Sequence, residues 1–161
     1  MAQTIPAEKD PQILLQIREF LNALNNSGGK PLETMTPQDA RQVLVDAQKS
    51  VEFDFSDIVE TERQITQDGI TVNIHITKPA KTASEKLPVF MFTHGGGWIL
   101  GDYPTHRRLV RDLVVNSGAA AVFTDYTPSP EAKYPTAINQ IYAAAKWVSE
   151  NGDEIGVDGK N

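Results

Sequence analysis

A run of three glycines between a histidine and a tryptophan is the feature of this sequence best suited to chemistry. The run is His94-Gly95-Gly96-Gly97-Trp98, and it follows the apolar residues 87–93, which are typical of a buried strand. Successive glycines let backbone N–H groups point inward without interference from side chains. Such groups stabilise the charged oxygen of a tetrahedral acyl-transfer intermediate, each by about 3 kcal/mol. The pattern favours an oxyanion hole, in which we expect His94 and Asp102 to brace the loop by hydrogen bonds.

Two nucleotide-binding motifs fit this loop poorly. A dinucleotide-binding loop needs a third small residue in G-x-G-x-x-G/A, and counting from Gly95 that position holds Leu100. Asp125 follows the loop by about 30 residues, whereas the ribose-binding acid is expected after about 20. A P-loop needs lysine after its last glycine, and here Asp102 follows Gly101. Nucleotide binding and a purely structural glycine turn remain as alternatives for this loop.

The composition is that of an ordinary globular chain with a net negative charge. The 161 residues carry 15 basic and 21 acidic side chains, a formal charge of −6, and no cysteine. Disulfides, thiolate metal sites and cysteine nucleophiles are therefore excluded. Nucleic-acid binding needs clustered basic residues, which an acidic chain without a basic stripe does not offer. The nearest approach to a cluster is Arg107, Arg108 and Arg111, which we expect to form a solvated helix face.

The N-terminal residues 1–10 lack the basic start and apolar run of a secretion signal. No apolar segment of the sequence reaches the length needed to span a bilayer. We therefore expect a cytoplasmic protein with no membrane span, and no cofactor is expected.

Helical spacing of apolar residues dominates the first part of the chain. Asp10 and Pro11 have the character of an N-cap and a first helical residue, and Gly28-Gly29 is expected to end that helix. Thr36-Pro37 is expected to start a second helix. The chain is therefore predicted to open with two helices.

After these helices the pattern changes to strand spacing. Apolar and polar residues alternate on both sides of Asp68-Gly69, which predicts a β-hairpin, and a polar loop is expected over 78–86. The following segments are predicted as strand, helix, strand and helix, with both strands buried on both faces: 87–93, 105–117, 119–124 and a helix from Pro135 to Gly152. This order predicts an α/β fold, in which an antiparallel hairpin leads onto a mostly parallel sheet. Turn residues at 158–161 are expected to lead into another strand, which the 161-residue sequence does not contain.

A second motif lies downstream of the glycine loop. It reads Asp125-Tyr126-Thr127-Pro128-Ser129-Pro130-Glu131 and is followed by Tyr134-Pro135. Together the two motifs resemble the hormone-sensitive-lipase-like branch of the α/β-hydrolase superfamily, the fold-3 carboxylesterases and lipases, whose second motif reads D-Y-R-L-A-P-E…F-P. The resemblance covers roughly residues 55–161. The chain departs from it where Thr127, Pro128 and Ser129 replace Arg-Leu-Ala, and because that arginine braces the loop, the local packing is in question.

The resemblance implies an α/β-hydrolase fold of which this chain is the N-terminal half. Residues 1–50 would be an N-terminal helical cap segment, and 51–161 would be the N-terminal half of the hydrolase domain. By the same resemblance the N–H groups of Gly96 and Gly97 would supply two oxyanion donors, with His94 bracing the loop.

The substrate and the second motif are assigned by the same resemblance. Trp98 and Leu100 would line the pocket for a small-molecule ester. Tyr126 and Glu131 would have structural roles.

The resemblance also implies a catalytic triad that these residues do not contain. The nucleophile is expected in G-x-S-x-G, and no serine of the chain has that context. His75, His94 and His106 all come too early in the chain for the triad base. We therefore expect the chain alone to lack the nucleophile and to be inactive. Its expected partner is the C-terminal half of the same hydrolase, as a second chain or a cleaved segment.

The function expected on this basis is that of a serine carboxylesterase or lipase acting on short- to medium-chain carboxylic esters, with this chain supplying the oxyanion hole. The alternative is a non-catalytic protein, either a truncated hydrolase-like product or a binding module that retains the pocket. A G-x-S-x-G motif shortly after Asn161 would favour the enzyme.

Overall fold

The two N-terminal helices fall in different units of the chain. The structure is a computed structural model that describes residues 5–160, and it divides the chain into Met1–Met35 and Thr36–Asn161. Helix α1 (Leu15–Asn25) belongs to the first unit and helix α2 (Pro37–Lys49) to the second. The assignment of both helices to one cap segment over 1–50 remains a prediction.

The two helix starts differ in how well the sequence predicted them. Thr36 caps α2 as expected, because its hydroxyl accepts a hydrogen bond from the Asp39 N–H at 3.2 Å. The prediction that α1 starts at Asp10 and Pro11 is wrong, since that helix begins at Leu15. The Asp10 carboxylate instead accepts from the Gln12 N–H at 2.9 Å, which closes a turn before the helix.

The predicted β-hairpin is confirmed. Strands β1 (Ile58–Gln67) and β2 (Ile70–Pro79) pair antiparallel along their whole length. Asp68 and Gly69 have φ of 53° and 78°, and positive φ at both central residues is the mark of the turn whose twist suits a hairpin. Strand β2 runs to Pro79 and so takes in the first residues of the expected loop, which also holds a short 3₁₀ turn at Ala80–Thr82.

Strands β3 (Leu87–Phe92), β4 (Ala120–Asp125) and β5 (Val157–Asp158) complete a mixed sheet in the order β1-β2-β4-β3-β5. β3 pairs parallel with both β4 and β5, whereas β4 pairs antiparallel with β2. The predicted α/β class is confirmed. The sequence did not predict β5, which begins just before the expected turn at 158–161 and pairs with Leu87 and Pro88.

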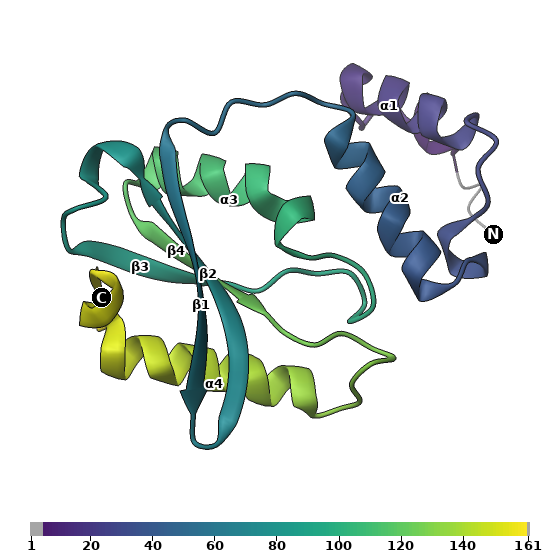
Figure 1. Ribbon diagram of the computed structural model, residues 1–161. Coiled ribbons are helices and arrows are strands. Elements are labelled where there is room, and N and C mark those ends of the chain that lie inside the picture. The colour runs from purple at the N-terminus through teal and green to yellow at the C-terminus, as the bar shows by residue number, and fades with distance from the viewer. Residues whose placement is uncertain (1–4, 161) are drawn as a thin grey trace. The chain divides into compact units, whose positions relative to one another are not determined.

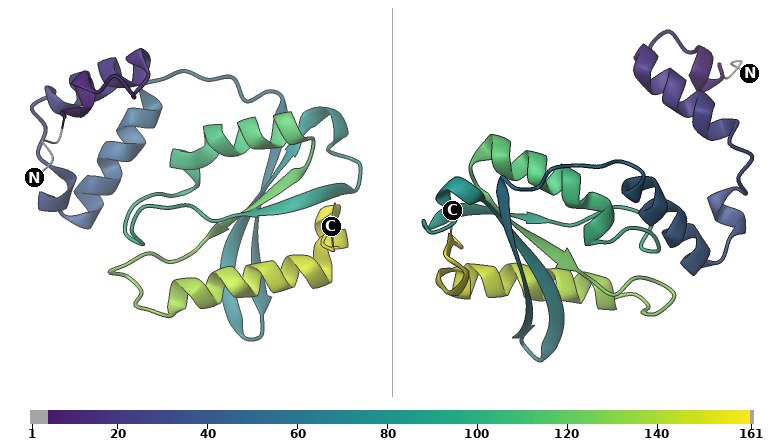
Figure 2. Two further views of the ribbon diagram at one scale, coloured as in Figure 1. Left: turned by 180° about the vertical axis from the view of Figure 1, so that it is seen from behind. Right: turned by 45° about the horizontal axis from the view of Figure 1, so that its top comes forward.

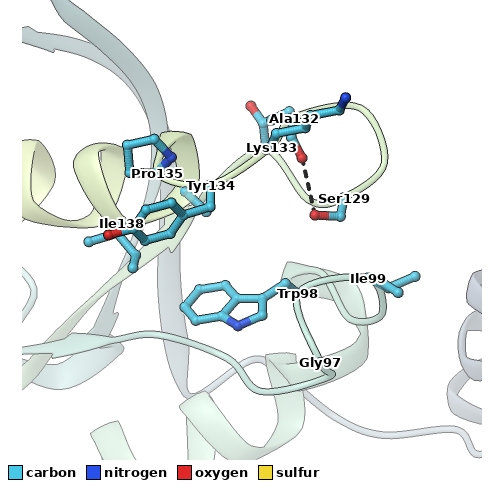
Figure 3. Close-up of a pocket in the computed structure, with 11 residues that line it drawn as sticks. Gly97, Trp98, Ile99, Ser129, Ala132, Lys133, Tyr134, Pro135 and Ile138 are labelled. Atoms are coloured by element: carbon cyan, nitrogen blue, oxygen red, sulfur yellow. Dashed lines mark hydrogen bonds between the residues drawn. The ribbon is translucent and has the colours of Figure 1, made fainter.

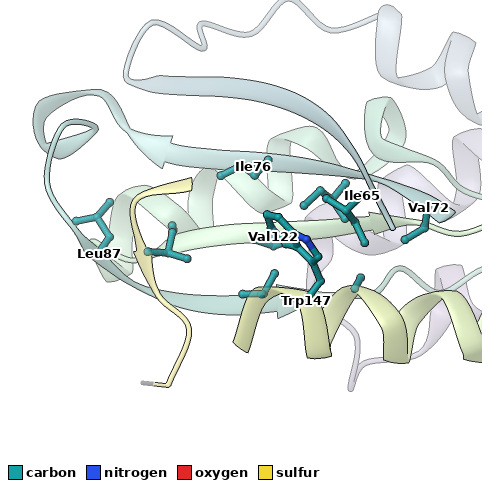
Figure 4. Packing of buried hydrophobic residues seen from close by; sticks show 11 residues of the cluster. Ile65, Val72, Ile76, Leu87, Val122 and Trp147 are labelled. Atoms are coloured by element: carbon teal, nitrogen blue, oxygen red, sulfur yellow. The ribbon is translucent and has the colours of Figure 1, made fainter. Parts of the chain in front are cut away.

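Two helices cover opposite faces of this sheet, α3 (Tyr103–Ser117) and α4 (Thr136–Asn151), as Figure 1 shows and Figure 2 repeats from behind. On the α4 side Trp147 packs with strand residues such as Val122 and Ile65 (Figure 4). On the α3 side the core contains the following buried residues: Ile58, Tyr103, Val110, Val114, Ala121 and Phe123. The sheet thus separates two apolar cores.

The central strands differ in burial. All of β4 up to Thr124 is buried, as predicted, but β3 is only half-buried after Leu87. The expectation that β3 is buried on both faces is therefore wrong. Within residues 5–160, the outer edge of β3 is paired only at Leu87 and Pro88, so the segment 89–92 has a strand on one side alone. In that same part of the chain, no helix has the length and apolar character to cross a membrane.

The basic residues of α3 do not form a solvated face, contrary to the expectation. Arg107 donates from Nε to Glu60 at 2.8 Å, and Arg111 donates from Nε to Asp57 at 3.0 Å. The Arg108 guanidinium lies 4.6 Å from the centre of an aromatic ring, that of Phe53. Because α3 packs beside the start of β1, Arg107 joins the helix to that strand, while Arg108 and Arg111 join it to residues just before the strand.

Candidate active site

The glycine loop forms a tight turn at the C-terminal end of β3. The N–H groups of Ile99 and Leu100 both donate to the Gly96 carbonyl, at 3.2 and 2.9 Å. Gly96, Gly97 and Trp98 have φ of 124°, 63° and 64°. A Cβ on Gly96 would lie 2.0 Å from the Leu100 carbonyl oxygen, so only glycine fits there.

The N–H groups of Gly96 and Gly97 are unused within the turn. Among the hydrogen bonds of residues 5–160, none has either group as its donor. Backbone N–H groups in a folded chain normally have hydrogen-bond acceptors, and those without one can donate to an acceptor on a bound ligand. The two N–H groups that the resemblance assigns to an oxyanion thus have no acceptor among the described residues, and the same is true of the N–H groups of Gly95, Trp98 and Gly101.

His94 lies beneath the loop and is 5% exposed. Its ring stacks on Phe123 and on Tyr126, with centroids 5.4 and 4.5 Å apart. The Nδ1 atom lies 2.8 Å from the Gly95 carbonyl, and because a carbonyl only accepts, Nδ1 carries the proton. Burial lowers the pKa of His94 below its usual 6.5, so the ring is neutral at pH 7.

The far end of the loop is held by Gly101 and Asp102. A Cβ on Gly101 would lie 2.6 Å from Nδ1 of His94, so the absence of a side chain lets the loop close over the imidazole. Asp102 does not bond the glycines as expected. It caps α3, accepting from the Thr105 N–H at 2.9 Å while its own N–H donates to the Thr105 hydroxyl at 2.9 Å.

The second motif lies directly against the glycine loop. The Tyr126 hydroxyl donates to the His94 carbonyl at 3.0 Å, and the Ser129 N–H donates to the Trp98 carbonyl at 2.7 Å. These two bonds join the loop after β4 to the loop after β3. Strands that run parallel bring their C-terminal loops to one edge of the sheet, so the two motifs meet there.

Thr127 stands where the family has an arginine, and helix α4 supports the loop at this point. The Thr127 N–H donates to the Gln140 side-chain oxygen at 2.8 Å, and the Gln140 amide nitrogen donates to the Thr127 hydroxyl at 3.1 Å. The packing that the sequence left in question is therefore supplied by a glutamine in the second turn of the final helix.

Sequence reasoning missed Arg41 of α2. Its Nε donates to the Ile99 carbonyl at 2.7 Å, and its Nη1 donates to the Glu131 carboxylate at 2.7 Å. These partners are 58 and 90 residues away along the chain. A local sequence pattern carries no signal for contacts over such separations.

A pocket of about 240 Å³ opens beside the loop, with Trp98 on one side and Tyr134, Pro135 and Ile138 on the other (Figure 3). The Trp98 indole and the Tyr134 ring project into it from opposite sides. Leu100 does not line this pocket; it lines a separate hollow with Leu44 and His106. The structure therefore brings Trp98, but not Leu100, to the apolar pocket next to Gly97.

The remaining histidines lie in packed positions. The His75 ring stacks on Tyr103 with centroids 4.1 Å apart, and the His106 ring lies 5.2 Å from that of His94. Over residues 5–160, no group of three or more His, Asp or Glu side chains is placed to hold a metal ion.

The comparisons with known proteins agree with this geometry. A family model described as the α/β hydrolase fold matches residues 90–161. The carboxylesterase NlhH of Mycobacterium tuberculosis is 39% identical over 98 residues, which cover 60% of this chain and 30% of that protein. A thermostable esterase from Pseudomonas putida is 58% identical with a TM-score of 0.89, covering 94% of this chain and 47% of its own.

A more distant solved structure has the same fold. An esterase from the archaeon Pyrobaculum calidifontis is 30% identical with a TM-score of 0.76, covering 89% of this chain and 45% of its own. The chain thus spans less than half the length of each of these relatives. The predicted resemblance to the hormone-sensitive-lipase-like branch of the α/β-hydrolases is confirmed: residues 90–161 match the α/β-hydrolase family model, and the relatives that the chain matches are carboxylesterases and esterases.

Proposed function

We propose that this chain forms the oxyanion-hole part of a serine carboxylesterase or lipase acting on short- to medium-chain carboxylic esters. The observation that carries the proposal is the pair of unused N–H groups on Gly96 and Gly97, in a turn fixed at the C-terminal end of β3. The relatives named above are esterases. The proposal includes the cytoplasmic location expected from the sequence, which fractionation of the source cells would test.

In the proposed reaction a serine hydroxyl attacks the ester carbonyl, and the carbonyl oxygen gains a negative charge. The N–H groups of Gly96 and Gly97 donate hydrogen bonds to this oxygen, each contributing about 3 kcal/mol to the transition state. Collapse of the intermediate releases the alcohol and leaves an acyl-serine, which water then hydrolyses. The serine, the acid and the triad histidine would come from residues outside 1–161.

The ester would extend from the donors into the pocket beside Gly97. Trp98, Tyr134 and Ile138 give this pocket apolar walls, which suit an acyl or alcohol group of modest size. Leu100 has a role in holding the turn, because its N–H donates to the Gly96 carbonyl; its side chain lines a different hollow, which Gly96 also lines.

The proposed partner is the C-terminal half of the same hydrolase, as a second chain or a cleaved segment. Support comes from β3, whose segment 89–92 is half-buried and carries a strand on one edge only among the described residues. A strand continuing from β5 would pair with this edge and satisfy its backbone groups. The same strand would approach the glycine loop from the side away from β4.

A fusion tests the proposal directly. Residues 1–161 are followed by the part of the Pseudomonas putida esterase that lies beyond the matched region, and hydrolysis of p-nitrophenyl acetate and butyrate is measured. We expect turnover by the fusion and none by the chain alone. A folded fusion that binds an ester analogue without hydrolysing it would contradict the proposal and support the non-catalytic alternative.

The role of Gly97 as a donor is tested by a substitution that removes its N–H hydrogen and alters little else. Replacing Gly97 by glycolic acid through protein ligation exchanges the N–H for an oxygen and preserves the freedom of a glycine. We expect kcat to fall about 100- to 1,000-fold in the fusion. Gly95→Ala is the matched control, because its Cβ would meet open space; a similar loss in both variants would remove the specific role of Gly97.

A further inference from the structure

The guanidinium of Arg41 bonds both loops of the candidate site. From helix α2 it donates to the Ile99 carbonyl at 2.7 Å and to the Ser129 carbonyl at 2.8 Å. It also pairs with the Glu131 carboxylate through Nη1 at 2.7 Å and Nη2 at 2.9 Å. Four hydrogen bonds from one planar group suit arginine, whose donors point in fixed directions, and not the single ammonium of lysine.

One of these bonds meets the glycine turn at Ile99, the residue after its strained residue. Trp98 has φ of 64°, a left-handed conformation that is costly for any residue with a side chain. The Trp98 carbonyl accepts from the Ser129 N–H, and the next carbonyl, that of Ile99, accepts from Arg41. The turn is therefore held from outside at two successive carbonyls, directly after the donors of the proposed oxyanion hole.

Glu131 orients the guanidinium for this contact. The hydrogen bond from Arg41 lowers the pKa of Glu131 to about 2, so the carboxylate is charged at any pH used for ester hydrolysis. The carboxylate is 40% exposed, and an exposed ion pair stabilises a fold little by itself. The Glu131 carboxylate acts by orienting the Arg41 guanidinium so that its Nε donor faces the Ile99 carbonyl.

We infer that Arg41 is a positioning residue that joins helix α2 to the glycine loop and so sets the orientation of the Gly96 and Gly97 N–H groups. This inference rests on the proposed function, since it gives the oxyanion donors a support from helix α2. It follows that α2 contributes to the rate of the chemical step, and not only to the covering of the substrate.

Hydrogen exchange tests the positioning without any need for activity. The N–H groups of Ile99 and Leu100, which close the turn onto Gly96, are followed in the 161-residue chain. We expect exchange about tenfold faster in Arg41→Ala and Arg41→Lys, the effect of losing one hydrogen bond, with β4 amides unchanged. The control Gln42→Ala, whose side chain bonds Asp46 on the same helix, should match the wild type.

Two outcomes of the exchange measurement would overturn the inference. One is wild-type protection of Ile99 and Leu100 in the Arg41 variants. The other is an equal acceleration in β4, which would show general destabilisation in place of local positioning.

Steady-state kinetics of the fusion supply the second measurement. We expect Arg41→Ala and Arg41→Lys to lower kcat about tenfold with little change in KM. Misplaced N–H groups of Gly96 and Gly97 would weaken binding of the transition state but not binding of the substrate. A raised KM with normal kcat would overturn the inference. An inactive wild-type fusion would count against the proposed function, while hydrogen exchange would still decide the role of Arg41.

Discussion

The hydroxyl of Tyr126 donates to the main-chain carbonyl of His94 at 3.0 Å, while the two rings stack with centroids 4.5 Å apart. This contact joins the second residue after β3 to the first residue after β4. Both side chains are buried, so the hydrogen bond is shielded from water. The glycine loop therefore rests on a rigid aromatic stack that the second motif completes.

Tyr126→Phe should lower the free energy of unfolding of the fusion by about 1–2 kcal/mol, because the stack remains while the buried His94 carbonyl loses its donor. Urea denaturation measures this change. Tyr142→Phe removes a hydroxyl from a side chain that is 68% exposed and should leave stability unchanged. Equal losses in the two variants would show that the hydroxyl of Tyr126 has no special role.

Gly101→Ala should be more destabilising than Gly118→Ala, although both glycines have positive φ. At Gly118 a Cβ meets open space, so the cost is only that of placing an alanine in the left-handed backbone conformation, about 1 kcal/mol. At Gly101 the Cβ would collide with Nδ1 of His94, which should add about 1–3 kcal/mol. Thermal unfolding of both variants compares these costs, and similar Tm values would contradict the packing described here.

The stability of the fold should decrease as the pH falls below about 6.5, in part because of His94. Burial lowers the pKa of His94 in the folded state, so the unfolded chain takes up the proton first and acid favours unfolding. Above pH 7 the residue is neutral in both states and contributes no pH dependence. Urea midpoints from pH 8 to 5 measure the slope, which His94→Gln should reduce; an unaltered slope would mean that His94 has the same pKa in the folded and unfolded states.

Trp98→Ala should raise KM for p-nitrophenyl butyrate about tenfold in the fusion, because the pocket beside Gly97 loses an apolar wall. The backbone should change little, since alanine and tryptophan pay a similar cost at a positive φ. Trp98→Phe keeps an aromatic wall and should retain most of the affinity. If both variants have wild-type KM, the ester does not occupy this pocket.

Local patterns were sufficient for much of the fold. Alternation around Asp68-Gly69 predicted the hairpin, and the Thr36-Pro37 cap predicted the start of α2. Where a prediction failed, a tertiary or competing local contact was the cause. Asp10 closes a turn ahead of α1, and the arginines of α3 meet acidic and aromatic partners on and near β1.

By itself the sequence determined the glycine loop, because a turn with glycine at positions 95–97 and 101 is a local property of the backbone. It also determined the order of strands and helices, since periodicity of two or 3.6 residues is local too. Only the tertiary structure decided what holds the loop. Tyr126, Ser129 and Arg41 reach it across 31 to 58 residues, because partners so distant become neighbours only once the sheet has formed.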